Sequence, residues 1–250
     1  MSILSKEFWL QFSSPKTFYP VAGRMIPWFA GGAILLTLVG LYIGLLAAPT
    51  DFQQGDAYRI IYIHVPAAWM SMFIYIVMSV YAGMGLVLNA RLSNMMATAL
   101  APTGAMFAFL ALWTGALWGR PTWGAYWVWD ARLTSQLILL FLYLGYIALQ
   151  AAIDDPRRAY RASAVLALVG VINVPIIYFS VQWWNTLHQG SSINISQAPK
   201  MASIMLTTML IMSLAAWLYA IAIALFRVRV IILERERHSD WVRDLVGARP

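Results

Sequence analysis

The chain has 250 residues, of which 61% are hydrophobic and only 11% are charged, and its mean hydropathy is +0.69. Soluble domains are typically about half apolar and a quarter charged, so this composition excludes an ordinary soluble globule. The 14% aromatic content excludes a disordered chain. The absence of cysteine excludes disulfides, thiolate metal sites and a C-x-x-C-H haem attachment motif. The sequence predicts a polytopic membrane protein.

Long stretches without Asp, Glu, Lys or Arg locate the membrane spans, because a helix needs about 20 apolar residues to cross the hydrocarbon core. They predict an all-α, single membrane domain over 1–250 with six transmembrane helices near residues 27–48, 67–88, 97–118, 134–152, 163–182 and 202–225. The polar end of the fifth stretch, 182–199, is rich in Ser, Asn, Gln and Gly and is expected to be a loop.

The basic residues predict the orientation of the bundle through the positive-inside rule. With both termini in the cytoplasm, only four of the 17 Lys and Arg residues lie outside, namely Arg59, Arg120, Arg132 and Lys200. The net charge of +7 therefore reports topology, and we expect lipid rather than nucleic acid as a partner. The basic tail 227–250 is expected to extend into the cytoplasm as a helix.

The external segment 118–133 is the most unusual part of the chain, because five large aromatics lie within 12 positions: Trp118, Trp123, Tyr126, Trp127 and Trp129. Trp and Tyr often form a belt at the membrane surface, and this alternative remains open. A belt needs only one or two rings per helix end. A stacking platform for a planar, mostly apolar molecule explains the density of rings better.

Two of the three histidines lie in external segments on either side of this platform. His64 precedes Pro66 at the mouth of the second helix, and His188 lies in the loop after the fifth. A single histidine there is more often a hydrogen-bonded interfacial residue, but two with aromatic neighbours favour the axial ligation of haem iron. His238 lies in the cytoplasmic tail and is assigned no role.

External cations and a carboxylate complete the candidate site. Arg59, Arg120 and Arg132 could contact haem propionates, because the guanidinium fork matches a carboxylate, although lipid headgroups are the alternative partners. Asp130 could cap the fourth transmembrane helix, pair with Arg132 or orient an imidazole, and capping is the simplest of these roles.

The stretch WGAYWVWDARLTS resembles the tryptophan-rich WWD signature of haem-handling membrane proteins of cytochrome c maturation, and most closely the haem exporter protein C (CcmC) family. The resemblance covers essentially the whole chain and includes IYIHVPAAW at 61–69 and the loop of His188. Tyr126 stands where another Trp is expected, which preserves an aromatic face but not an indole hydrogen bond.

The resemblance implies transient binding of haem b at the periplasmic face of the bacterial inner membrane and its delivery to the haem chaperone CcmE. It also implies association with the single-span subunit CcmD and the ABC-type subunits CcmA and CcmB. His64 and His188 would be the axial ligands, and the platform for haem and chaperone would comprise Trp118, Trp123, Tyr126, Trp127, Trp129 and Asp130. We expect no enzymatic activity. The chain has no G-x-x-x-x-G-K-[ST] motif, so any ATP hydrolysis must come from a partner.

Three other functions remain alternatives. A secondary transporter would place charges within its spans or break paired helices, and Pro102 and Pro175 leave some room for this. A bis-histidine electron-transfer subunit would hold its haem stably. A structural subunit would use its aromatic residues only as membrane anchors.

Overall fold

The computed structural model describes residues 14–188 and 201–247, and this part of the chain is helical with no β-strand. In chain order its elements are α2 (Pro15–Leu41), the π-helix η1 (Tyr42–Ala47), the 3-10 helix η2 (Asp56–Ile60), α3 (Ile61–Leu88), α4 (Arg91–Trp123), α5 (Ala131–Ala152), α6 (Pro156–Gly170), α7 (Asn173–Trp183), α8 (Ser203–Arg235) and α9 (Asp240–Leu245).

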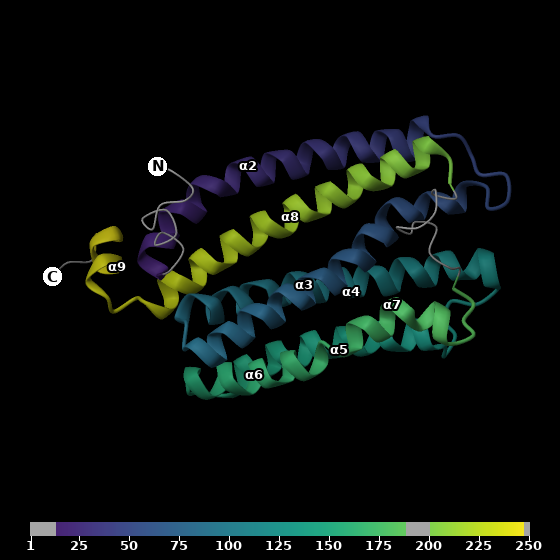
Figure 1. Ribbon diagram of the computed structural model, residues 1–250. Coiled ribbons are helices and arrows are strands. Elements are labelled where there is room, and N and C mark those ends of the chain that lie inside the picture. The colour runs from purple at the N-terminus through teal and green to yellow at the C-terminus, as the bar shows by residue number, and fades with distance from the viewer. Residues whose placement is uncertain (1–13, 189–200, 248–250) are drawn as a thin grey trace.

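Six helical segments are long and apolar enough to cross a membrane, which confirms the prediction of an all-α polytopic bundle. They are Pro15–Ala47, Asp56–Leu88, Arg91–Trp123, Ala131–Ala152, Pro156–Trp183 and Ser203–Arg235. The start of α2 and the helix α9 lie at one end of the bundle, and the start of α3 and the ends of α4 and α7 lie at the opposite end (Figure 1). The prediction that the termini face the cytoplasm remains a prediction.

Two helix pairs organise the bundle. α3 packs along α4, and α2 packs along α8 (Figure 1). α5, α6 and α7 complete the group around α3 and α4, where the largest cluster of buried side chains includes Tyr75, Met78, Leu139 and Tyr143. α8 also contacts α3 and α4, so it joins the α2–α8 pair to the main group.

Several helices extend beyond the spans expected from charge-free sequence. α2 begins at Pro15 because the Ser14 hydroxyl accepts a hydrogen bond from the Thr17 N–H at 3.3 Å and proline suits the first helical position. α4 continues to Trp123, where the Thr122 hydroxyl donates to the Trp118 carbonyl at 2.7 Å. Uncharged stretches of sequence do not indicate such local hydrogen bonds. As a result, half of the expected loop 118–133 is helical.

The fifth span is broken between α6 and α7, as Pro175 predicts. Proline has no N–H to donate to the carbonyl of Val171 and its ring clashes with that group. The Val171 carbonyl instead accepts from the Val174 N–H at 3.0 Å, which forms a turn between the two helices. The corresponding expectation for Pro102 is wrong, because α4 runs continuously past it.

The basic tail continues α8 as predicted and then folds back as α9. The Glu236 carboxylate binds the Arg91 guanidinium at 3.0 Å and accepts from the Trp241 indole N–H at 3.1 Å. These contacts attach the end of α8 and the start of α9 to the start of α4.

Candidate functional site

His64 and His188, which come from opposite halves of the chain, lie together at the end of the bundle away from the termini. Their ring centroids are 6.3 Å apart and their planes differ by 33°. Imidazole nitrogens bind metal ions at about 2 Å and lie about 1.2 Å from the ring centroid, so two imidazoles on one ion have centroids about 6.4 Å apart. The observed spacing therefore fits two axial ligands of one iron atom.

A partly open cavity of about 360 Å³ lies beside the two imidazoles, within the usual size range of small-molecule sites. Its walls combine the two histidines with two indoles, one cation, two glutamines of the loop between η1 and η2, and small residues of α3 and α4. The lining residues used below are His64, His188, Trp118, Trp123, Arg132, Gln53, Gln54, Gly115 and Gln136. This mixture of apolar, aromatic and cationic groups suits a flat apolar ligand that carries carboxylates.

His64 is held from three sides in the first turn of α3. Its Nδ1 lies 3.0 Å from the Thr114 hydroxyl oxygen, and the Trp118 ring meets it edge to face with centroids 5.7 Å apart. A Cβ atom built on Gly115 would lie only 3.0 Å from Cε1 of His64. α4 therefore approaches this imidazole as closely as a glycine permits.

The last turns of α4 place Trp118 and Trp123 against the cavity. The Trp118 indole N–H donates to Oε1 of Gln54 at 2.7 Å, which fixes the orientation of that ring. The Trp123 ring centroid lies 6.2 Å from that of His188. Gly124 ends the helix with φ +80°, a left-handed conformation that favours glycine, and so turns the chain back immediately after Trp123.

The remaining aromatics of the segment 118–133 lie outside the cavity lining, and they are Tyr126, Trp127 and Trp129. Trp129 is 77% exposed and Tyr126 is 58% exposed, while Trp127 packs edge to face on Trp129 with centroids 5.3 Å apart. The sequence predicted one platform, whereas the structure separates two indoles in the cavity from a group of rings beside it.

Asp130 caps α5, which confirms the simplest of its expected roles. Its Oδ1 accepts the N–H of Leu133 at 2.8 Å. Within residues 14–188 and 201–247, no group hydrogen-bonds to its buried Oδ2 or to the buried indole nitrogen of Trp127. Buried polar groups in native proteins usually have partners, so these two atoms remain available for a further hydrogen bond.

Of the three candidate arginines, the structure brings only Arg132 into the cavity wall. One of its nitrogens donates to the Ile177 carbonyl of α7 at 2.6 Å. Arg120 donates to the carbonyl of Gly124 and lies over the Tyr126 ring, 5.7 Å from the centroid. Arg120 thus supports the end of α4 from outside the cavity.

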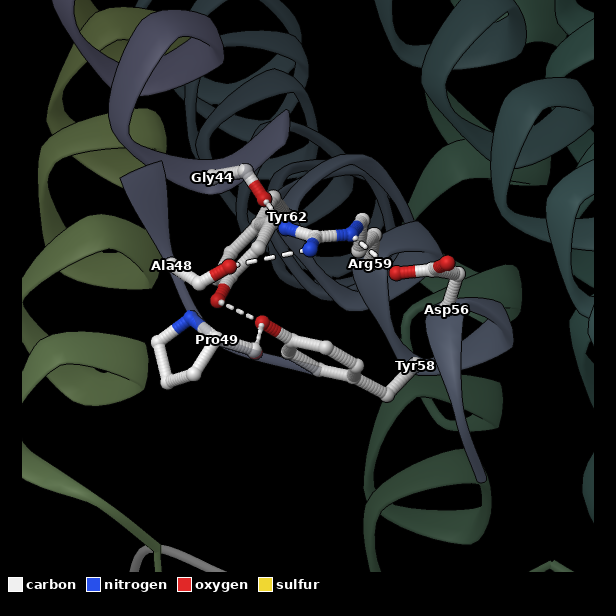
Figure 2. Close-up of polar contacts among 7 residues, drawn as sticks. All are labelled: Gly44, Ala48, Pro49, Asp56, Tyr58, Arg59 and Tyr62. Atoms are coloured by element: carbon white, nitrogen blue, oxygen red, sulfur yellow. Dashed lines mark hydrogen bonds and ion pairs between the residues drawn. The ribbon is translucent and has the colours of Figure 1, made fainter. Parts of the chain in front are cut away.

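Arg59 instead forms a clamp between the ends of η1 and η2 (Figure 2). It donates to the carbonyls of Gly44 and Ala48 at 2.6 and 2.9 Å, and its Nε lies 2.8 Å from the Asp56 carboxylate. The adjacent Tyr58 hydroxyl donates to the Pro49 carbonyl at 2.7 Å (Figure 2). These contacts hold the two ends of the loop that carries Gln54. They also occupy the N–H donors of Arg59 that were expected to contact haem propionates.

Four residues of the site were not foreseen from the sequence. Gln54 orients Trp118, Gln136 lines the cavity and donates to the Ser71 hydroxyl at 3.0 Å, and Thr114 and Gly115 contact His64. Each is a common residue type in a plain context. The one available signal was helical spacing, because Gly115 and Trp118 lie three residues apart and so share a face of α4.

The family described as Heme exporter protein C matches residues 8–243 of the chain. The chain is 48% identical over 237 residues to Heme exporter protein C of Escherichia coli K12, which covers 94% of this chain and 95% of that relative. The chain belongs to the heme exporter protein C family. It is also 48% identical over 230 residues to the family member of Bradyrhizobium diazoefficiens, covering 92% of this chain and 87% of the relative. The Haemophilus influenzae member is 42% identical over 238 residues, with coverages of 95% and 97%.

Membership in the heme exporter protein C family supports a role in haem handling for cytochrome c maturation and confirms the resemblance found in the sequence. The residues of the cavity suit that cargo. The cavity gathers two imidazoles at the spacing of axial ligands, two indoles and one arginine, and groups of these kinds are suited to iron, to a flat macrocycle and to carboxylates.

Proposed function

We propose that the protein binds haem between His64 and His188 at the periplasmic face of the bacterial inner membrane and delivers it to the chaperone CcmE. The observation that carries this proposal is the 6.3 Å separation of the two imidazole centroids beside a cavity lined by Trp118 and Trp123. Arg132, in the same wall, supplies a cation for a propionate. Arg59 and Arg120 would act indirectly, by holding the loop and helix end that form the cavity.

The two histidines are supported differently, and this difference suggests how the site both holds and releases its cargo. His64 belongs to α3, packed against α4, whereas His188 follows the end of α7 in a connecting segment. Segments outside packed helices open at lower free energy. His64 therefore acts as the fixed ligand and His188 as the ligand that is exchanged. When bound, haem supplies the reactive vinyl groups, and the chain supplies orientation and exclusion of other iron ligands.

The exposed rings give the proposed chaperone a surface beside the cavity. Trp129 and Tyr126 face outward next to the helix end that carries Trp123, so a partner seated on them would reach the cavity mouth. We assign the inner indoles to haem and the outer rings to CcmE. CcmD, CcmA and CcmB are the other partners that we propose, and a haem of the b type bound transiently is the proposed cargo. We propose no catalytic residue.

Spectroscopy of histidine variants tests the ligation. His64→Ala and His188→Ala are expected to abolish the low-spin, six-coordinate absorption spectrum of the purified, haem-loaded protein. His238→Ala is the matched control, because His238 lies in the segment between α8 and α9, far from the cavity, and contacts Arg237. A wild-type spectrum in both cavity variants would refute the proposal.

Transferability separates this function from that of an electron-transfer subunit. Haem that passes from the purified protein to CcmE, in a manner dependent on Trp129, supports delivery. Haem that stays bound in stoichiometric amount through reversible oxidation and reduction supports the alternative.

A further inference from the structure

The hydroxyl of Thr114 sits between a backbone carbonyl and an imidazole nitrogen. Its oxygen lies 2.5 Å from the carbonyl oxygen of Leu110 and 3.0 Å from Nδ1 of His64. A threonine hydroxyl has one hydrogen to donate, and a carbonyl oxygen can only accept. Two oxygens at 2.5 Å need that hydrogen between them. The hydroxyl therefore donates to Leu110, and its lone pair accepts from His64.

This assignment determines the tautomer of His64. Since the Thr114 oxygen accepts, Nδ1 must carry the hydrogen, and in the neutral ring Nε2 then carries the lone pair. We propose that Thr114 is a positioning residue that fixes His64 in the Nδ1–H tautomer and thereby reserves Nε2 for the haem iron. The identity of the ligand rests on the proposed function, whereas the tautomer rests on the hydrogen bonds alone.

The surroundings of the ring favour this one arrangement. Turning the imidazole over would replace Nδ1 with a carbon atom opposite Thr114 and break the hydrogen bond. The ring also has little space to move, because Gly115 lies beside Cε1 and the Trp118 edge packs against it. Thr114 itself is buried within α4, so water competes weakly for its hydroxyl. A hydrogen bond donated by the second imidazole nitrogen orients a ligand and raises its basicity.

Nitrogen-15 NMR of the haem-free protein tests the tautomer directly. The chain has three histidines, so selective ¹⁵N-histidine labelling with His64→Ala as the assignment control identifies the His64 signals. We expect the Nδ1–H tautomer in the wild type and in Thr114→Ser, and loss of that preference in Thr114→Val. An Nε2–H tautomer in the wild type overturns the proposal. So does a Thr114→Val variant that keeps the Nδ1–H tautomer of the wild type. Thr114→Ala replaces the valine variant if that variant does not fold.

Haem binding provides a second readout. Thr114→Val is expected to weaken haem affinity about tenfold and to shift the midpoint potential of bound haem to a more positive value, because the ligand becomes less basic. Thr114→Ser should restore both. Thr208→Val is the matched control, since Thr208 makes the same type of bond, to the Ile204 carbonyl at 2.7 Å, on α8 away from the cavity.

The two proposals fail in different ways. If His64→Ala keeps the six-coordinate spectrum, the ligand assignment fails while the NMR result on the tautomer stands. If His64→Ala loses the spectrum but Thr114→Val binds haem with wild-type affinity and potential, the role of Thr114 fails while ligation stands.

Discussion

Replacing Gly115 with alanine should separate haem binding from protein stability. The new methyl carbon would lie 3.0 Å from Cε1 of His64 and 3.5 Å from Nδ1, whereas ordinary carbon contacts begin near 3.4 Å. The imidazole must therefore move away from α4 by roughly half an ångström, because packed interiors leave little free space. Thr114 lies on the same helix, so this movement also lengthens the hydrogen bond to His64.

The expected cost falls on binding and not on folding. Disturbing the hydrogen-bonded support of a metal ligand typically weakens binding 10- to 100-fold, and we expect about tenfold for Gly115→Ala, or about 1.4 kcal/mol. Alanine is in turn a better helix former than glycine, by about 1 kcal/mol in water. This gain offsets much of the cost of displacing the packed imidazole, so the free energy of unfolding should change little while haem affinity decreases.

Haem titration followed by absorbance, together with thermal unfolding of the same detergent-solubilised samples, measures both quantities. Gly31→Ala is the matched control, because a methyl group there would meet no atom within 4 Å in α2. A Gly115→Ala variant that binds haem within about twofold of the wild type would refute the assigned position of His64 against α4.

Three further predictions concern the supports of the cavity. Arg59→Lys should lower the melting temperature, since a single ammonium group cannot bridge the carbonyls and carboxylate that Arg59 holds; thermal unfolding with Arg157→Lys, at an exposed position of α6, as control checks this. Trp118→Phe and Gln54→Leu should each lower the free energy of unfolding by about 1 kcal/mol, and the double variant should lose no more than either single variant, because the two residues share one hydrogen bond. A double-mutant cycle measures this. Asp130→Ala should cost about 1 kcal/mol of unfolding free energy through loss of the α5 cap, and Asp130→Asn much less, by chemical denaturation.

Contrary results would be equally specific. An unchanged melting temperature in Arg59→Lys would mean that the clamp contributes nothing, and additive losses at Trp118 and Gln54 would mean that their hydrogen bond is not shared. Equal effects of alanine and asparagine at Asp130 would exclude capping as its contribution.

The membrane architecture was readable from the sequence because the hydrocarbon core tolerates few charges. All six spans and the helical tail follow from the placement of Asp, Glu, Lys and Arg, and Pro175 also predicted the break in the fifth span. The helix ends were less predictable. They depend on local hydrogen bonds such as that of Ser14 to Thr17, and on whether a proline such as Pro102 finds compensation within a continuous helix.

The residue types that the candidate site gathers could be predicted from the sequence, but which of them line the cavity could not. Histidine is scarce and the WWD segment is dense in aromatic residues, so His64, His188 and the indoles stood out. Arg59 and Arg132 look alike in sequence and both donate to backbone carbonyls, but only folding places Arg132, and not Arg59, in the cavity wall. Thr114 is one of many threonines, and its significance comes from its distance to His64 across two helices.

The break between α6 and α7 makes α7 a separate helix within the fifth span. α7 packs mainly against α5, ends at Trp183 and leads directly to Trp184 and His188, so one short segment carries the proposed ligand and the two indoles that precede it in sequence. Grafting residues 173–188 from another family member would exchange this half of the site and leave the scaffold of α3 and α4 intact. Such chimeras would show whether this segment alone determines how fast the proposed cargo is released.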